Sequence, residues 1–419
     1  MAIKYKLSFV LVTITVLLSQ SLWAGPAERN QAKRIHDRLT GVPATNAIID
    51  DMEDLLEGTS VNGYAGDVSG KTAAQYAIDT AQNPNARYFY NVTLKNFAAP
   101  WTNEEQTVFT PLNDYSATVI GLVRDDADFR RVLYDDVVYH GLNNPAYSNS
   151  NNNHYEALEA LGPITGDLSN PAILVADTQS SVTGLPSAAT AGIMTSRAGA
   201  MAFFSDGTNR AMFRFTLMNH MCTDLEPIKD VSRAPDKVRQ DISRSPGGDS
   251  RIFLNSCVGC HAGMDGMTGA FAYYEWDYTN DKTDGNLVFT DGAVSAKHMI
   301  NSENFEPGHQ VTDDSWINYW RNGQNWLLGW GTAVNPDTKG NETGNGAKSL
   351  GQELANSSAF AQCQVDKVFE AVCLRSPSEF FDDGVTRDRF ERDNIVNRFK
   401  TTYNMRDVFT DVAAHCKGS

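Results

Sequence analysis

Two cysteines and a histidine lie close together near the middle of the chain, within the run from Asn255 to His261. Residues three or four positions apart lie on one side of a helical turn, so Cys257, Cys260 and His261 would face the same way. In this C-x-x-C-H spacing the two thiols can form thioether bonds with the vinyl groups of one porphyrin, while the imidazole binds the iron. The sequence therefore predicts one covalent haem c, attached at Cys257 and Cys260, with His261 as the proximal iron ligand.

A close cysteine pair can also hold zinc or act as a redox dithiol. A structural zinc site needs a second pair of cysteine or histidine ligands at short spacing, and the other four cysteines are scattered along the chain. A redox dithiol needs no histidine directly after the second cysteine, and the surrounding sequence lacks a thioredoxin-like setting. Covalent haem is therefore the preferred interpretation.

The second axial ligand is less well defined by the sequence. Haem iron in electron carriers usually takes methionine or histidine at this position. Met299 follows the haem motif at a distance that allows the chain to reach the opposite face of the ring, so it is the preferred candidate, ahead of His298 and His309. His220 and Met221 are upstream alternatives. An open sixth position would favour catalysis over electron transfer.

The residues before the haem motif predict a helix that would hold it. Phe253 and Cys257 share a helical face, and Asp249 or Ser250 can act as the N-cap. Downstream aromatic residues form either a wall beside the porphyrin or an aromatic core patch, and several arginines could pair with haem propionates. The aromatic residues are Trp316, Tyr319, Trp320, Trp326 and Trp330, and the arginines are Arg197, Arg210, Arg214 and Arg321.

The first residues predict export. Lys4 and Lys6 precede an apolar run from Leu7 to Leu18, which is typical of a secretory signal peptide, and the small residue Ala24 marks the expected cleavage site. The run is shorter than the ~20 residues that a membrane-spanning helix needs. We therefore expect residues 1–24 to be removed and the protein to reach the periplasm without a transmembrane anchor. Export also suits covalent haem attachment, which is completed beyond the membrane.

Composition and charge indicate a folded, acidic protein. Of the 419 residues, 41% are hydrophobic and 21% are charged, as in ordinary globular proteins. The formal net charge is −16, and loss of Lys4 and Lys6 with the signal peptide makes it −18. Such a surface disfavours nucleic acid and anionic membranes, and it favours a basic redox partner protein.

Helix-like spacing of apolar residues dominates the chain and strand signals are few, so we expect a mainly α, multi-domain protein with a c-type cytochrome haem region. The mature chain is too long for one core. Within the haem region, Thr195–Cys222 is expected to form two helices, and the charged, proline-containing stretch Pro227–Gly248 is expected to be a connection. The predicted units are an N-terminal helical domain (25–190), a haem-binding domain (191–340) and a C-terminal helical module (341–419).

The four cysteines outside the haem motif are expected to form two disulfides, because the chain is exported. Cys363 and Cys373 fall in Ala359–Leu374, which predicts a single helix. Ten helical residues separate their Cα atoms by ~15 Å, beyond the ~7 Å limit for a disulfide. Cys222 is therefore expected to pair with one of these two cysteines, and Cys416 with the other.

Four parts of the chain, taken together, are similar to one protein family. They are Arg38–Pro43, Ala191–Cys222, Cys257–Asp265 and Leu354–Val368. They resemble the planctomycete-type cytochrome c-associated proteins, in which a haem signature is typically followed by Met-Asp, as at Met264 and Asp265 here. Gly266 departs from that pattern, since proline is typical there. The resemblance implies an exported, mainly helical, multi-module protein with one haem, and it points to no substrate.

The leading functional hypothesis is one-electron transfer in the periplasm, with the haem iron carrying the electron. An electron carrier needs only a part of so long a chain. A haem oxidoreductase of peroxidase or oxidase type, with a substrate pocket formed by the N-terminal region, is therefore an alternative. A third hypothesis is a non-catalytic subunit of an envelope complex, which would dock through the acidic surface.

Overall fold

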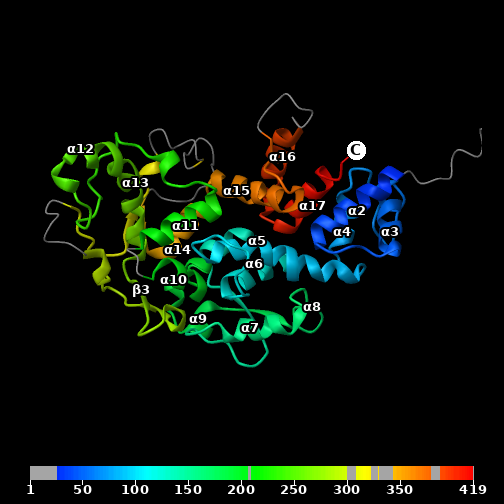
Figure 1. The fold of residues 1–419 in the computed structure, drawn as a ribbon, viewed down its shortest axis with the longest axis horizontal. Helices are drawn as coiled ribbons and strands as arrows, with labels where there is room; N and C mark the ends of the chain where they lie inside the picture. Colours follow the sequence, from blue (N-terminus) through cyan, green and yellow to red (C-terminus); the bar gives the residue numbers. More distant parts are fainter. Residues whose placement is uncertain are drawn as a thin grey trace, which may run out of the picture.

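The structure is a computed structural model that describes residues 26–205, 209–299, 308–321, 329, 343–378 and 387–418. It is mainly α, as predicted, and the described strands form three separate antiparallel pairs. The molecule is elongated, with helices α2 to α4 at one end of its long axis and helices α12 and α13 at the other (Figure 1). The haem motif therefore lies far from the N-terminal helices.

Two of the N-terminal helices begin at capping residues. Thr45 caps one of them by accepting a hydrogen bond from the Ile48 amide. Asn113 and Ser116 form a capping box at the start of α6, and every side chain of α6 is buried. The helices are α2 (Pro26–Thr40), α3 (Asn46–Leu56), α4 (Lys71–Ala77), α5 (Lys95–Ala98), α6 (Asp114–Arg124), α7 (Asn153–Ala160), α8 (Gly162–Thr165) and α9 (Gln179–Thr183), and strand β1 (Val138–Gly141) pairs with β2 (Leu174–Asp177).

The middle of the chain contains the haem motif. The two helices predicted within Thr195–Cys222 are present as α10 (Arg197–Phe203) and α11 (Arg210–Met221). The later elements are α12 (Ser250–Ile252), a π-helical turn (Phe253–Cys257), α13 (Val258–Thr268), the short 3-10 helices η12 (Ala296–Met299) and η14 (Tyr319–Arg321), and two strand pairs. These pairs are β3 (Tyr274–Asp277) with β4 (Asn286–Phe289) and β5 (Ser315–Ile317) with β6 (Thr343–Asn345).

The C-terminal helices run from beside α11 back to the N-terminal end of the molecule (Figure 1). They are α14 (Gly346–Ala355), α15 (Ser358–Val368), a π-helical turn (Phe369–Cys373), α16 (Arg387–Thr402) and α17 (Met405–His415). Helix α17 packs against α2 and α4 (Figure 1). Arg34 and Arg38 of α2 donate hydrogen bonds to the carbonyl oxygens of Lys417 and Cys416. The two ends of the described chain are therefore joined.

One large hydrophobic core runs through most of the described helices. It includes Ile35 of α2, Ile120 of α6, Phe213 of α11, Leu350 of α14 and Val412 of α17, all of which are almost fully buried. These residues come from all three units predicted from the sequence. The domain boundaries expected at residues 190 and 340 therefore remain predictions.

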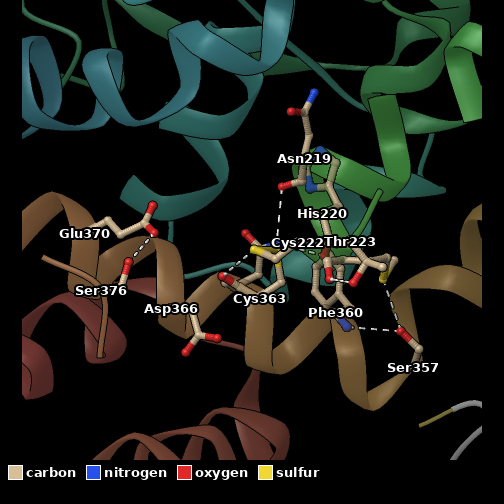
Figure 2. The surroundings of a disulfide bond; sticks show 12 residues. Asn219, His220, Cys222, Thr223, Ser357, Phe360, Cys363, Asp366, Glu370 and Ser376 are labelled. Atoms are coloured by element: carbon tan, nitrogen blue, oxygen red, sulfur yellow. Dashed lines mark hydrogen bonds between the residues drawn. A yellow bond between two sulfur atoms is a disulfide. The ribbon is translucent and has the colours of Figure 1, made fainter. Parts of the chain in front are cut away.

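Two disulfides link distant parts of the chain. Cys222 at the end of α11 bonds to Cys363 on α15, with their Cα atoms 5.2 Å apart, and Figure 2 shows this bond between the two helices. Cys373 bonds to Cys416, with a Cα separation of 5.7 Å. The pairing of Cys363 with Cys373 was correctly excluded, because α15 and the π-helical turn that follows it place them along one continuous helix.

The predicted signal peptide, residues 1–24, lies outside the described residues. In the part of the chain that the structure describes, no helix combines the length and the apolar character required to span a membrane.

Replacing both Cys373 and Cys416 with serine should destabilise the protein, because this disulfide closes a loop of 43 residues and ties α17 to the rest of the C-terminal helices. Loop closure of this size predicts a loss of about 2–5 kcal/mol in the free energy of unfolding. Guanidinium denaturation of the oxidised protein measures the loss. An unchanged midpoint, or a peptide map that joins Cys373 to Cys222, would contradict the assigned pairing.

Candidate haem-attachment site

The haem motif lies on a continuous helical segment from Ser250 to Thr268, which comprises α12, a π-helical turn and α13. Asp249 caps its start by accepting a hydrogen bond from the Arg251 amide, so the predicted helix and one of its two candidate N-caps are confirmed. The helical spacing places Cys257, Cys260 and His261 on one side of the segment. The two thiols are half-buried, and the His261 side chain is 21% exposed.

Cys257 and Cys260 are the two cysteines left unpaired, since the other four form the disulfides. Burial, followed by the charge of Glu226, raises the pKa of the Cys260 thiol. A reactive redox dithiol instead requires a lowered thiol pKa. Among the described residues, no group of three or more histidine, cysteine, aspartate or glutamate side chains converges to hold a metal ion. The raised thiol pKa disfavours the dithiol alternative.

Glycines lie on the opposite side of α13 and directly after its C-terminal end. A Cβ atom at Gly263 would lie 2.0 Å from Nε1 of Trp320, and one at Gly269 would lie 2.3 Å from the Ser315 carbonyl oxygen. At Gly259 it would lie 3.1 Å from Cβ of Lys229. The glycine side therefore packs against backbone and side chains at short distance, and the helix can present its thiols only on the other side.

Two of the aromatic residues downstream of the motif belong to the core, whereas Tyr319 is half-buried and its hydroxyl donates a hydrogen bond to Asp236. Trp320 is fully buried against the glycine side of α13 and beside Phe213, with ring centroids 5.7 Å apart, and Trp316 is 4% exposed. The core-patch alternative therefore applies to Trp316 and Trp320. Trp326 and Trp330 lie outside the described residues.

His261 is held by a buried carboxylate one helical turn away. Its Nδ1 atom lies 3.1 Å from Oδ1 of Asp265, whose side chain is completely buried. Arg210 donates from Nε and Nη2 to the two oxygens of the same carboxylate, at 2.8 and 3.0 Å, and the Arg239 amide donates to it at 3.2 Å. No described residue bonds to Nε2 of His261, so this nitrogen can bind iron.

The network continues from Arg210 away from the haem motif. Arg210 also forms a bidentate ion pair with Asp241, at 2.7 and 2.8 Å, and Arg239 donates to Asp241 at 2.8 Å. Nη1 of Arg239 lies 3.1 Å from Nδ1 of His298, and Nε2 of His298 lies 2.8 Å from the side-chain amide of Asn209. Two carboxylates and two guanidinium groups thus balance each other in the interior.

Burial and charge fix the protonation of this network. Burial alone would raise the pKa of the Asp265 carboxyl, but the charge of Arg210 and the hydrogen bonds from His261 and Arg210 hold it well below its usual range. Burial and the neighbouring charge of Arg239 lower the pKa of His298 to about 3, so this ring is neutral. Asp265 is therefore a carboxylate acceptor for the His261 Nδ1–H group.

The candidates for the second axial ligand lie in different surroundings. Both ring nitrogens of His298 are engaged by Arg239 and Asn209 in the interior. His309 is half-buried in a cavity of about 610 Å³ that Asp265 also lines, and no described residue bonds to its ring. Met299 ends η12, and its side chain lies outside the described residues.

The upstream candidates face the core instead. His220 is fully buried, with Nε2 2.8 Å from the Tyr115 hydroxyl, and its ring lies near Phe360 beside the first disulfide (Figure 2). Met221 is buried too, and its sulfur accepts a hydrogen bond from Ser357. Neither side chain is available to a haem at Cys257 and Cys260.

Arg244 is a further candidate to pair with a haem propionate, because one of its buried guanidinium nitrogens has no hydrogen-bond partner among the described residues. Its guanidinium carbon lies 4.9 Å from the ring centre of Phe253, one turn before Cys257, and Nη2 donates to the Val238 carbonyl oxygen at 2.9 Å. Nη1 is buried and has no hydrogen-bond partner among the described residues. The arginines suggested by the sequence have protein partners instead, which are Asp265 and Asp241 for Arg210, Asp224 for Arg214, Glu353 for Arg321 and backbone carbonyls for Arg197.

The sequence alone did not identify Arg239 and Asp241 as members of the buried network around His261. The stretch Pro227–Gly248 was predicted to be a connection, and it contains no long helix or strand, but Val238 and Arg239 are fully buried. Val238 packs with Phe253, Val258 and Ala262 in a small core of its own under the haem segment. The contact between Asp265 and His261 could have been predicted from the sequence, because a carboxylate four residues after a histidine lies on the same face of a helix.

Comparisons with known protein families, curated proteins and solved structures find no match to this chain. The resemblance to cytochrome c-associated proteins is therefore supported only by the segments quoted above. Function is inferred from the side chains around α13.

Replacing Gly263 with alanine should destabilise the protein, because the new Cβ atom would overlap Nε1 of the fully buried Trp320. Overpacking of this kind costs about 1–3 kcal/mol in the free energy of unfolding, which thermal or denaturant unfolding measures. Ser256 is exposed on the same helical segment, so Ser256→Ala is the control and should stay within about 0.5 kcal/mol of the unaltered protein. Equal effects of the two changes would refute the close packing of α13.

Proposed function

We propose that this protein is an exported c-type cytochrome that carries one covalent haem and transfers single electrons. The observation that carries the proposal is the arrangement on the Ser250–Thr268 segment. The two cysteines left out of disulfides and a histidine with an open Nε2 face the same way from one helix. The partly exposed thiols and the orphaned Nη1 of Arg244 fit the attachment points and a propionate of one haem.

Each side chain has a part in holding the group. Cys257 and Cys260 would form the thioether bonds, His261 would bind the iron, and Arg244 would pair with a propionate. Asp265 fixes the orientation of the His261 ring. The bound haem supplies the change of redox state, and the protein supplies binding, orientation and the surrounding charge.

The proposal includes the location of the protein and the kind of partner that it meets. The N-terminal pattern supports export to the periplasm, where such haems are attached, and membership of the cytochrome c-associated family would be consistent with one haem in a mainly helical chain. The formal net charge of −16 favours a basic partner protein for electron exchange.

Covalent haem is tested by expressing the full chain in a host that matures c-type cytochromes. The denatured protein should give a pyridine haemochrome spectrum of c type and a haem-stained gel band. The Cys257→Ala,Cys260→Ala double variant should lose the stained band, since both thioether sulfurs are gone, whereas Ser256→Ala should keep it. A protein of native fold with no haem band would remove the basis of this proposal.

A second candidate function is a haem oxidoreductase that binds peroxide or oxygen at an open iron. The hydrogen bond from His261 to a carboxylate favours it, because such a ligand supports higher oxidation states of iron. The engagement of His298 by Arg239 and Asn209 also removes one candidate for the sixth position.

Optical spectra of the ferric protein decide between the two functions. For an electron carrier we expect a low-spin, six-coordinate spectrum with little response to cyanide, and Met299→Ala or His309→Ala should convert it to a high-spin form that binds cyanide. His140→Ala, in strand β1, is the control and should change neither property. A high-spin spectrum in the unaltered protein, with peroxide turnover above that of free haem, would favour the oxidoreductase instead.

A further inference from the structure

The hydrogen-bond acceptor of His261 is an anion. An iron-bound histidine donates its second ring N–H to a carboxylate, a backbone carbonyl or water, and the choice tunes the basicity of the ligand. Here the acceptor is Oδ1 of Asp265, at 3.1 Å, on the same helix. We propose that Asp265 is a positioning residue that makes His261 a strong electron donor to the iron and so lowers the reduction potential of the haem. This inference rests on the proposed haem attachment.

The physical reason is a transfer of charge through the imidazole. A carboxylate that accepts the Nδ1 proton increases the electron density on Nε2, which binds the metal. Ferric iron carries one more positive charge than ferrous iron, so a more basic ligand stabilises the ferric state more. Hydrogen bonding around an axial ligand is one of the established means by which proteins set haem potential.

Asp265 is built to remain ionised and in place. Its two oxygens receive four hydrogen bonds, from His261, from Nε and Nη2 of Arg210, and from the Arg239 amide, and the side chain is fully buried. Arg210 is itself held by Asp241 through two further bonds. The carboxylate therefore cannot turn away from His261 without breaking a buried network, in which each polar group depends on the others.

Asp241 provides a matched comparison within the same network. Both aspartates pair with Arg210 and both side chains are at most 4% exposed. Only Asp265 contacts His261. Removing the charge of either aspartate changes the net charge of the network by one unit, but only the change at Asp265 alters the histidine.

The experiment measures the midpoint potential of the matured holoprotein by optical titration. Asp265→Asn should raise the ferrous-to-ferric ratio at fixed potential at least tenfold more than Asp241→Asn does, which is a difference of about 59 mV for one electron. Asp265→Glu restores the charge and should recover most of the low potential. Equal shifts in Asp265→Asn and Asp241→Asn would show that net charge alone is responsible, and would overturn the inference.

A measurement that leaves Asp265 unaltered guards against an Asp265 variant that does not fold. The iron–imidazole stretching frequency is recorded by resonance Raman spectroscopy on five-coordinate ferrous haem, in whichever of Met299→Ala and His309→Ala opens the sixth position, or in the unaltered protein where that position is already open. It should be higher in the protein than in the haem peptide released from the same protein by proteolysis, where water replaces Asp265. Equal frequencies would refute the role of Asp265, whereas absence of covalent haem would refute the proposed function before either measurement is made.

Discussion

The buried ion pair between Arg210 and Asp265 fixes the relation between α11 and the haem-motif helix. Its atoms lie 2.8 Å apart, with Asp265 fully buried. Removing one partner of such a pair costs about 3–5 kcal/mol, because the remaining charge is stranded away from water. The pair and the glycine contacts around Trp320 act on different sides of α13, so together they determine how the helix is rotated. That rotation leaves Cys257, Cys260 and His261 facing outward.

Helix α13 therefore packs closely against the interior on one side and presents reactive side chains on the other, and the two sides need different residues. Glycines on its inner side allow close approach to the segment from Ser315 to Trp320, at the cost of flexibility that glycine brings to a helix. The ion pair with Arg210 and the small core around Phe253 and Val258 compensate by anchoring both halves. The proposed haem attachment would need this rigidity, because a ligand histidine must keep its orientation relative to the ring.

Local patterns predicted the features that depend on residues near each other in sequence. The helix of the haem motif, its cap at Asp249 and the impossibility of a Cys363–Cys373 bond all follow from helical geometry. The choice of Cys363 as the partner of Cys222 depends on how α11 meets α15, which no local pattern contains. The burial of Arg239 and Asp241 was hidden for the same reason, since a charged stretch with proline resembles an exposed connection until its long-range partners are known.

The placement of the disulfides bears on how the protein is made. Cys222 and Cys363 are 141 residues apart, and the two haem cysteines lie between them in sequence. If the chain is exported N-terminus first, as proposed, Cys222 reaches an oxidising compartment together with Cys257 and Cys260 while Cys363 is still on the other side. Disulfide formation and the proposed haem attachment would then compete for the same sulfur atoms. Biogenesis would have to reduce premature bonds or ligate the porphyrin quickly, which would link the yield of this protein to thiol reductants in its cell.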